Sequence, residues 1–238
     1  MRVIWYDTLD STNSEALRHL GELPSGTVLA ARNQTAGRGQ RGNTWFTETG
    51  KNLTFSIVLK EIGLEAAHSV RLNALTSMAV HDFLQSYGAH PVIKWPNDIY
   101  VSGRKICGML IENSLDGPML GSSVIGIGIN INQRVFPQLA NATSLSLCTG
   151  KEYELEKALA DFLTIFEQRL PRLTSPELWA EYSSSLYRRG ERARYHDLLR
   201  DEEFEGVIKG VEADGRLRIL DASLKYRYFH FKEVSYIL

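Results

Sequence analysis

A glycine- and arginine-rich segment near residue 40 is well suited to binding an anion. It reads Gly37-Arg38-Gly39-Gln40-Arg41-Gly42. Glycines let backbone N–H groups approach an anion closely and form a concave nest. Arg38 and Arg41 add planar guanidinium groups whose donors suit phosphate or carboxylate. The segment therefore predicts a phosphate-binding loop; the plain alternative is a mobile, solvated surface loop.

The three glycines match the pattern G-x-G-x-x-G, which is weak support on its own. A dinucleotide-binding fold needs this pattern between a strand and a helix, but no helix is predicted after Asn43-Thr44-Trp45. A protein kinase needs H-R-D and D-F-G motifs, and a Walker A loop needs Gly-Lys-Ser/Thr after four residues. The sequence contains none of these, so all three nucleotide-binding classes are excluded.

A second cluster carries polar groups that suit a nucleotide. Lys94-Trp95-Pro96-Asn97-Asp98 is followed by Gly103-Arg104-Lys105-Ile106-Cys107-Gly108. The Asn97 amide both donates and accepts hydrogen bonds, so it can bind a purine or a sugar. Lys105 lies in a predicted hairpin, from which it can point its charge into a cleft. The alternative for Lys105 is an exposed hairpin cation.

A third cluster is the segment Val124-Ile125-Gly126-Ile127-Gly128-Ile129-Asn130. Glycines weaken a strand unless another group packs against the bare backbone. The segment therefore predicts either a strand that a ligand approaches closely or a tightly packed central strand.

Composition and charge exclude several classes of protein. The chain has 238 residues, with 27 basic and 28 acidic side chains and a net charge of −1, whereas a DNA-binding protein usually shows a basic excess. No apolar run approaches the ~18 residues that span a bilayer, and Asp7 and Asp10 lie where a signal peptide would be apolar. Balanced charge and the lack of an apolar span predict neither DNA nor a membrane as partner. Cys107 and Cys148 both lie in apolar runs, so we expect buried thiols in a reducing cytoplasm.

Hydrophobic periodicity predicts alternating strands and helices. Residues 33–52 have no periodicity, and compact domains rarely keep so long a loop unless it is functional. The predicted strands are Val3–Asp7, Thr27–Arg32, Leu53–Leu59, Val92–Lys94, Ile99–Val101, Ile106–Glu112 and Leu120–Ile131. The predicted helices are one from Ser11 or Thr12 to Leu20, opened by the capping box Thr12-Asn13-Ser14-Glu15, then Glu65–Ser86, Glu154–Leu170 and Pro176–Leu186.

The pattern changes at Arg188, where short strands begin. They are predicted at Ala193–Tyr195, Glu203–Glu212, Arg216–Leu220, Lys225–Phe231 and Val234–Leu238. Asp214-Gly215 is a typical hairpin turn between two of them. Four or five short strands in about fifty residues predict a small barrel, so the sequence predicts two domains, residues 1–187 and 188–238.

Taken together, these residues resemble the biotin–protein ligase family. The motifs that carry the resemblance are Ser11-Thr12-Asn13, Gln34, Gly37–Trp45, Lys94–Asp98, Gly103–Gly108, Gly126–Asn130 and Thr143-Ser144-Leu145. The resemblance implies an α+β fold: a class II synthetase-like catalytic domain, with a mixed sheet and helices on one face, followed by a small SH3-like β-barrel. It also implies the monofunctional type, without the N-terminal DNA-binding domain of many bacterial members.

The resemblance further implies an ATP-dependent ligase. Such an enzyme activates biotin as biotinyl-5′-AMP and transfers it to a lysine of a biotin carboxyl carrier protein, with Mg²⁺ accompanying the phosphates. The partners are then biotin, ATP and a carrier domain, and a homodimer is left open. No covalent enzyme intermediate is needed, so catalysis should depend on positioning and electrostatics.

Individual roles follow from the same resemblance. Lys105 and Arg38 are the implied catalytic residues, at the junction of carboxylate and α-phosphate, and Asp98 is a Mg²⁺ candidate. The implied biotin-binding residues are Ser11, Thr12, Asn13, Gln34, Gly37, Arg38, Gly39, Gln40, Lys105, Gly108 and Gly126. The implied adenylate-binding residues are Arg38, Gln40, Arg41, Trp45, Asn97, Lys105 and Asn130.

The sequence departs from the family pattern in the loop and at the end of the chain. Gln40 and Asn43 replace arginines that the family often has. The final Val-Ser-Tyr-Ile-Leu lacks the arginine that some members bring toward the nucleotide. Two alternatives stay open: a lipoate or octanoate ligase or transferase, which shares the catalytic fold, and a non-catalytic biotin sensor, which the uncharged Gln40 leaves possible.

Overall fold

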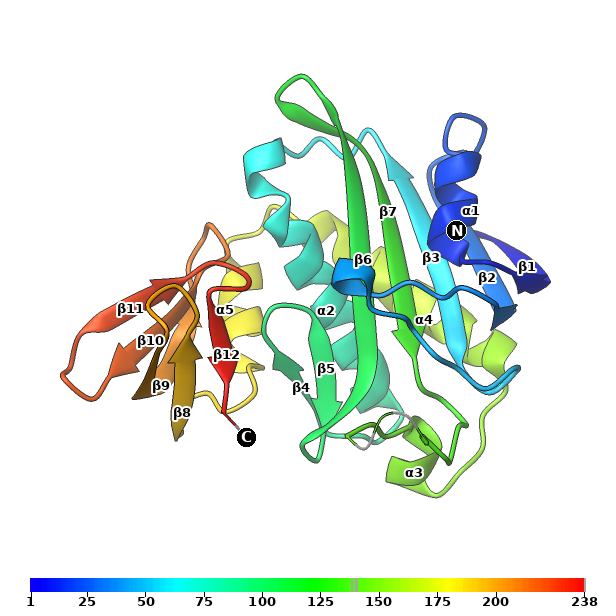
Figure 1. Ribbon diagram of the computed structural model, residues 1–238. Helices are drawn as coiled ribbons and strands as arrows, with labels where there is room; N and C mark the ends of the chain where they lie inside the picture. The colour runs from blue at the N-terminus through cyan, green and yellow to red at the C-terminus, as the bar shows by residue number, and fades with distance from the viewer. Residues whose placement is uncertain (138, 140, 238) are drawn as a thin grey trace.

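The larger part of the protein is a seven-stranded mixed sheet (Figure 1). The computed structural model describes residues 1–137, 139 and 141–237, without the side chain of Arg41. The strand order is β1-β2-β3-β7-β6-β5-β4, in which β1 and β2 are parallel and all other neighbours are antiparallel. In chain order the strands are β1 Arg2–Leu9, β2 Thr27–Gln34, β3 Leu53–Lys60, β4 Pro91–Lys94, β5 Asp98–Val101, β6 Arg104–Asp116 and β7 Met119–Ile129.

Two long helices cover one face of this sheet and leave the middle of the other face open to the candidate site. Helices α2 (Val70–Ser86) and α4 (Leu155–Arg169) lie behind the sheet in Figure 1. Their Phe83 and Phe162 belong to the main core, and Phe162 packs edge-on against Phe55 of β3 with ring centroids 5.2 Å apart.

The short helix α1 (Thr12–Arg18) lies on the opposite face. Its Ala16 packs in a separate small cluster with Leu29, Val58 and Val124. Successive strand residues point to opposite faces, so Val28 joins the main core while its neighbour Leu29 faces α1.

The second sheet is antiparallel and has five strands in the order β11-β10-β9-β8-β12. They are β8 Arg192–Asp197, β9 Glu202–Val211, β10 Leu217–Asp221, β11 Tyr226–Phe229 and β12 Val234–Tyr236. Helix α5 (Glu177–Ser184) lies between the two sheets in Figure 1. Tyr195, Ile208 and Ile219 belong to the same core cluster as the first sheet, so the two parts share buried apolar surface.

The predicted α+β fold class, with a mixed sheet and then a small all-β segment, is confirmed, and most predicted elements are present. The capping box was wrong: no side chain caps α1, and Thr12 Oγ1 lies 2.7 Å from Ser56 Oγ instead. The helix predicted over residues 65–86 begins as a 3₁₀ turn at Ala66–His68 before α2. Helix α3 (Leu145–Thr149) was not predicted from the sequence.

The two cysteines have different environments. Both are free, and Cys107 is buried as predicted, but Cys148 is exposed, so that half of the prediction was wrong. Cys148 lies on the short helix α3, which the sequence analysis missed. Among the described residues, no helix combines the length and apolar character that crossing a membrane requires.

Candidate functional site

A cavity of about 450 Å³ brings together residues from every predicted cluster. It lies between the open face of the first sheet, the loop that joins β2 to β3, and the second sheet. The predicted site residues that line it are Ser11, Thr12, Asn13, Gln34, Arg38, Gly39, Gln40, Trp45, Asn97, Asp98, Lys105, Gly108 and Gly126. Residues far apart in the sequence therefore share one pocket.

Two of the described predicted residues, Gly37 and Asn130, do not line this cavity. Gly37 packs against the loop itself, since a Cβ there would lie 2.4 Å from the carbonyl oxygen of Trp45. Asn130 is buried, and its Nδ2 donates to the carbonyl of Thr143 at 3.0 Å. The side chain of Arg41 lies outside the described part of the structure.

One end of the cavity is built from buried polar groups. Ser56 Oγ lies 2.6 Å from Asn13 Oδ1, and the Thr12 backbone N–H donates to Gln34 Oε1 at 2.7 Å. Thr12 and Asn13 are nearly inaccessible to solvent. The Asn13 amide lies directly over Gly126, where a Cβ would be 2.1 Å from its Oδ1. Glycine at this position therefore lets Asn13 approach the strand, and the fixed amides and hydroxyls can recognise a small polar ring.

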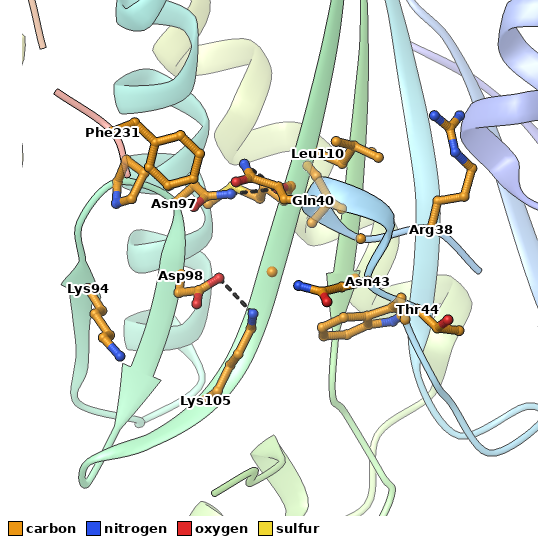
Figure 2. Close-up of a pocket in the computed structure, with 18 of the residues that line it drawn as sticks. Arg38, Gln40, Asn43, Thr44, Lys94, Asn97, Asp98, Lys105, Leu110 and Phe231 are labelled. Atoms are coloured by element: carbon orange, nitrogen blue, oxygen red, sulfur yellow. Dashed lines mark hydrogen bonds and ion pairs between the residues drawn. The ribbon is translucent and has the colours of Figure 1, made fainter. Parts of the chain in front are cut away.

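The loop of residues 37–44 makes local contacts within itself, and its Arg38 also forms an ion pair with a residue far away in the sequence. Arg38 forms a bridge with Thr44, and residues Gln40–Gly42 form a 3₁₀ turn. Arg38 Nη2 lies 2.7 Å from Oε1 of Glu112, and Nη1 donates to its Oε2 at 3.1 Å. Figure 2 shows the Arg38 guanidinium pointing away from Lys105. The structure thus does not bring Arg38 to the position beside Lys105 that the sequence analysis expects.

Trp45 packs on bare backbone in the floor of the cavity. A Cβ at Gly128 would lie 2.3 Å from Trp45 Cε2, and one at Gly108 would lie 3.1 Å from its Cζ3. The Lys105 ammonium lies 5.9 Å from the centroid of the same indole. Gly128 lines the cavity and was missed as a site residue, although the glycine spacing in this strand was the signal for close approach.

Two lysines give this side of the cavity its positive charge. Lys105 Nζ lies 2.7 Å from Asp98 Oδ1, a contact drawn in Figure 2. Lys94 Nζ lies 5.0 Å from the ring centroid of Tyr100 and 5.2 Å from that of Tyr236. Burial lowers the pKa of the Lys94 ammonium, and the nearby Asp98 carboxylate opposes that effect. Together the two ammonium groups can stabilise an anion in the cavity.

The second sheet forms part of the cavity wall, which sequence reasoning missed. Its lining residues are Leu198, Phe231, Lys232, Val234, Ser235 and Tyr236. They reach the site only because the two sheets pack together, and nothing in their local sequence signals this contact. The site is therefore complete only when both sheets are present.

The donor groups of the cavity are not those of a preformed metal centre. Among the described residues, no group of three or more His, Cys, Asp or Glu side chains is placed to hold a metal ion. Asp98 is the carboxylate in the lining. Mg²⁺ commonly binds through one or two carboxylates together with substrate phosphates. Asp98 is such a carboxylate, and its Oδ1 already contacts Lys105 Nζ. Asn97 is already used in part, because its Nδ2 donates to the Met109 carbonyl at 2.7 Å.

Comparison with known proteins decides the family. Residues 5–130, more than half of the chain, match the model of the biotin/lipoate A/B protein ligase family. The chain belongs to this family. The resemblance to biotin–protein ligases drawn from the sequence motifs is therefore confirmed.

Individual relatives in the family extend over nearly all of the chain. The bifunctional ligase/repressor BirA of Bacillus subtilis is 34% identical over 227 residues, which is 90% of this chain and 68% of that protein. This chain thus spans about two thirds of that relative's length. The biotin--[acetyl-CoA-carboxylase] ligase of Mycobacterium tuberculosis is 28% identical over 87% of this chain and 79% of that protein.

A solved structure of the family has the same fold as this protein. The biotin protein ligase from Aquifex aeolicus, in complex with biotin and ATP, matches with a TM-score of 0.79 and 26% identity. The match covers 98% of this chain and 97% of the other, so both sheets have counterparts in a biotin protein ligase.

Proposed function

We propose that this protein is an ATP-dependent biotin–protein ligase. It activates biotin as biotinyl-5′-AMP and transfers the acyl group to a lysine of a biotin carboxyl carrier domain. The observation that carries the proposal is the single cavity that joins a buried polar end, at Asn13, to a cationic middle, at Lys94 and Lys105. A cavity of this kind suits a small polar ring whose carboxylate must meet a phosphate.

The polar end favours biotin over lipoate. The ureido group of biotin donates and accepts hydrogen bonds, and the buried Thr12 and Asn13, together with the partly buried Gln34, supply groups of both kinds. A lipoyl or octanoyl chain carries no ureido group, so it would gain no hydrogen bonds from these polar groups. The cavity thus favours the biotin ligase over the lipoate or octanoate alternative.

Lys105 is the proposed catalytic residue. In the first half-reaction, a biotin carboxylate oxygen forms a bond to the α-phosphorus of ATP while the bond to pyrophosphate breaks. In the second, the carrier amine attacks the acyl carbon and AMP leaves. Negative charge gathers where carboxylate and phosphate meet, and a fixed ammonium there stabilises the transition state. Arg38 is the second proposed catalytic residue, but it must first leave Glu112.

The other lining residues are proposed to bind. Ser11, Thr12, Asn13 and Gln34 face the ureido ring, and Trp45 and Asn97 face the nucleotide. The loop, with Gly39, Gln40 and Arg41, covers the phosphates. Gly37 and Asn130 support the site from outside its wall. Mg²⁺, held by Asp98 and the phosphates, would neutralise phosphate charge.

The wider setting is also a proposal. Residues 1–187 form the catalytic domain and residues 188–238 a small SH3-like domain. The last strand of the first sheet along the chain ends at Ile129 and the first strand of the second sheet begins at Arg192, which supports this division. The protein substrate is a biotin carboxyl carrier domain, because the relatives are named as ligases for acetyl-CoA carboxylase. Two free cysteines agree with a reducing, cytoplasmic location.

Pyrophosphate release tests the function directly. We expect release that requires both ATP and biotin, followed by biotin transfer to a purified carrier domain. Release with lipoate or octanoate in place of biotin would instead support the lipoate alternative. Biotin binding without any release of pyrophosphate would identify a non-catalytic sensor.

A further inference from the structure

Glu112 contacts one proposed biotin-binding residue, Asn13, and one proposed catalytic residue, Arg38, without lining the cavity. It lies on β6, and its carboxylate accepts two hydrogen bonds from the Arg38 guanidinium, at 2.7 and 3.1 Å. The same carboxylate accepts a hydrogen bond from Asn13 Nδ2 at 2.8 Å. Its side chain is 26% exposed, so the contacts are reachable by solvent and by a competing anion.

The contact with Asn13 fixes the direction of an amide at the polar end. Asn13 Nδ2 donates to Glu112 and to the Leu110 carbonyl at 3.2 Å, while Oδ1 faces Ser56 Oγ at 2.6 Å. The carboxylate can only accept, so it keeps the NH₂ group turned toward β6. The amide therefore presents one defined orientation to a ligand.

The contact with Arg38 holds the loop arginine in the wrong place for catalysis. Figure 2 shows Arg38 directed away from Lys105, at the other side of the cavity. The pair is bidentate, which orients the guanidinium, but both partners are partly exposed. Because the pair is partly exposed, an incoming phosphate or carboxylate can reach it, and such an anion offers the guanidinium the same bidentate acceptor as Glu112.

We propose that Glu112 is a positioning residue that orients Asn13 and holds Arg38 apart from Lys105 until a substrate anion takes its place. The proposal rests on the proposed function for the identity of that anion. Glu112 touches neither substrate. It couples biotin binding to the position of the loop arginine, because one carboxylate binds both Asn13 and Arg38.

Two substitutions separate the two contacts. Glu112→Gln keeps an oxygen that accepts from Asn13 but removes the charge that holds Arg38. Glu112→Ala removes both. Asp116→Asn is the matched control, because Asp116 is an exposed acid on the same strand and does not line the cavity.

Limited proteolysis of the ligand-free protein measures how strongly Glu112 restrains the loop at Arg38. With an arginine-specific protease, we expect cleavage after Arg38, identified by fragment mass, to be severalfold faster in both Glu112 variants. Asp116→Asn should match the wild type. Equal cleavage rates in all four proteins would overturn the role in holding Arg38, whether or not the protein proves to be a ligase.

Biotin affinity and KM for ATP test the role of Glu112 toward Asn13 and toward the substrate anion. We expect Glu112→Ala to weaken biotin binding about tenfold and Glu112→Gln to restore it, whereas KM for ATP should fall in Glu112→Gln at unchanged kcat. A purely structural role would lower thermal stability without this split. Equal biotin affinity in both variants would overturn the role toward Asn13. Absence of pyrophosphate release from the wild type would contradict the proposed function alone, because the protease result stands without substrates.

Discussion

The indole Nε1 of Trp95 donates a hydrogen bond to the carbonyl oxygen of Gly215, at 3.1 Å. Trp95 belongs to the first sheet's turn between β4 and β5, and Gly215 to the turn between β9 and β10 in the second sheet. The next carbonyl, of Pro96, accepts from Asn73 Nδ2 at 2.7 Å and from Tyr182 OH at 2.6 Å. The turn that carries Asn97 and Asp98 into the cavity is therefore fixed from α2, α5 and the second sheet.

Removing the indole donor should weaken catalysis without abolishing it. Trp95→Phe is expected to lower kcat/KM for adenylate formation about threefold to tenfold, because a net hydrogen bond contributes about 0.5–1.5 kcal/mol. The measurement is ATP- and biotin-dependent pyrophosphate release. Trp179→Phe is the control: Trp179 lines the same 240 Å³ cavity behind the turn, and its Nε1 has no partner among the described residues. Equal losses in the two variants would assign the effect to lost volume.

Removing the Lys105 ammonium should affect chemistry far more than folding. Lys105→Ala is expected to slow adenylate formation by about 10²-fold or more, as loss of a transition-state charge partner does. The ion pair with Asp98 is about one-third exposed, so its loss should change stability by less than about 1 kcal/mol. Lys157→Ala provides the comparison, since Lys157 is also ion-paired but lies on the surface of α4. Near-normal synthesis of biotinyl-AMP by Lys105→Ala would remove this residue from the mechanism.

The solvent accessibility of the two cysteines gives a test of the core. Cys107 is buried, and burial raises the pKa of its thiol well above the usual value of about 9. The thiolate reacts with labelling reagents, not the thiol. At pH 8 we expect one thiol, Cys148, to react in the folded protein and both to react after unfolding. Labelling of Cys107 at the same rate as Cys148 would contradict the packing of β6.

The raised pKa of Cys107 also has a consequence for stability at high pH. The pKa of the Cys107 thiol is higher in the folded than in the unfolded protein. The contribution of the protonated thiol to the free energy of unfolding is therefore fully present below about pH 9. It is lost as pH rises toward the folded pKa. Cys107→Ala should therefore lose less stability than the wild type between pH 9 and 11, measured by denaturant unfolding.

Local signals in the sequence predicted most of the fold. Hydrophobic residues repeat along an element when one of its faces is buried. Helix α2 and the central strands β3 and β7 are extensively buried, so their patterns were strong enough to predict them. The capping box failed because Thr12 finds a tertiary partner in Ser56, and side-chain partners distant in sequence leave no local pattern. Helix α3 was missed because five residues are too few to show periodicity.

The candidate site was predictable where chemistry is concentrated in short motifs. Arg38, Asn97 and Lys105 come from such motifs, and all three line the cavity. Glu112 was missed because its partner Arg38 is 74 residues away in the sequence, and no local pattern indicates such a contact. Phe231 was missed because it reaches the cavity only through the packing of the two sheets. The glycines of β7 lie between these cases: their spacing signalled close approach, but not that Asn13 and Trp45 would be the approaching groups.

The neutral residue in the phosphate-binding loop should affect how long the intermediate stays bound. Gln40 lines the cavity, and its Nε2 makes a long contact of 3.5 Å with the Met109 carbonyl. A charge-assisted hydrogen bond contributes about 1.5–3 kcal/mol, against about 0.5–1.5 for a neutral one. Gln40→Arg is therefore expected to slow dissociation of biotinyl-AMP severalfold, and Gln40→Glu to speed it. Ligand-chase experiments measure both rates; equal rates would show that Gln40 does not contact the intermediate.

Two glycines on one strand should separate the two halves of the substrate site. A Cβ at Gly126 would lie 2.1 Å from Asn13 Oδ1, and one at Gly128 would lie 2.3 Å from Trp45 Cε2. Asn13 cannot yield easily, because Ser56 and Glu112 hold its amide on both sides. Gly126→Ala is therefore expected to weaken biotin binding at least tenfold, and Gly128→Ala to raise KM for ATP instead.

Titration calorimetry with biotin and steady-state kinetics with ATP measure the two effects. Gly121→Ala is the control, because Gly121 lies on the same strand outside the cavity, with Asp116 Cβ the nearest atom at 3.3 Å. If Gly126→Ala bound biotin like the wild type, Asn13 would not belong to the biotin pocket. If Gly128→Ala changed the affinity for biotin as much as KM for ATP, the indole of Trp45 would not belong to the nucleotide half of the site. Opposite responses of the two variants would place the ring at Asn13 and the adenylate at Trp45, with Lys105 between them.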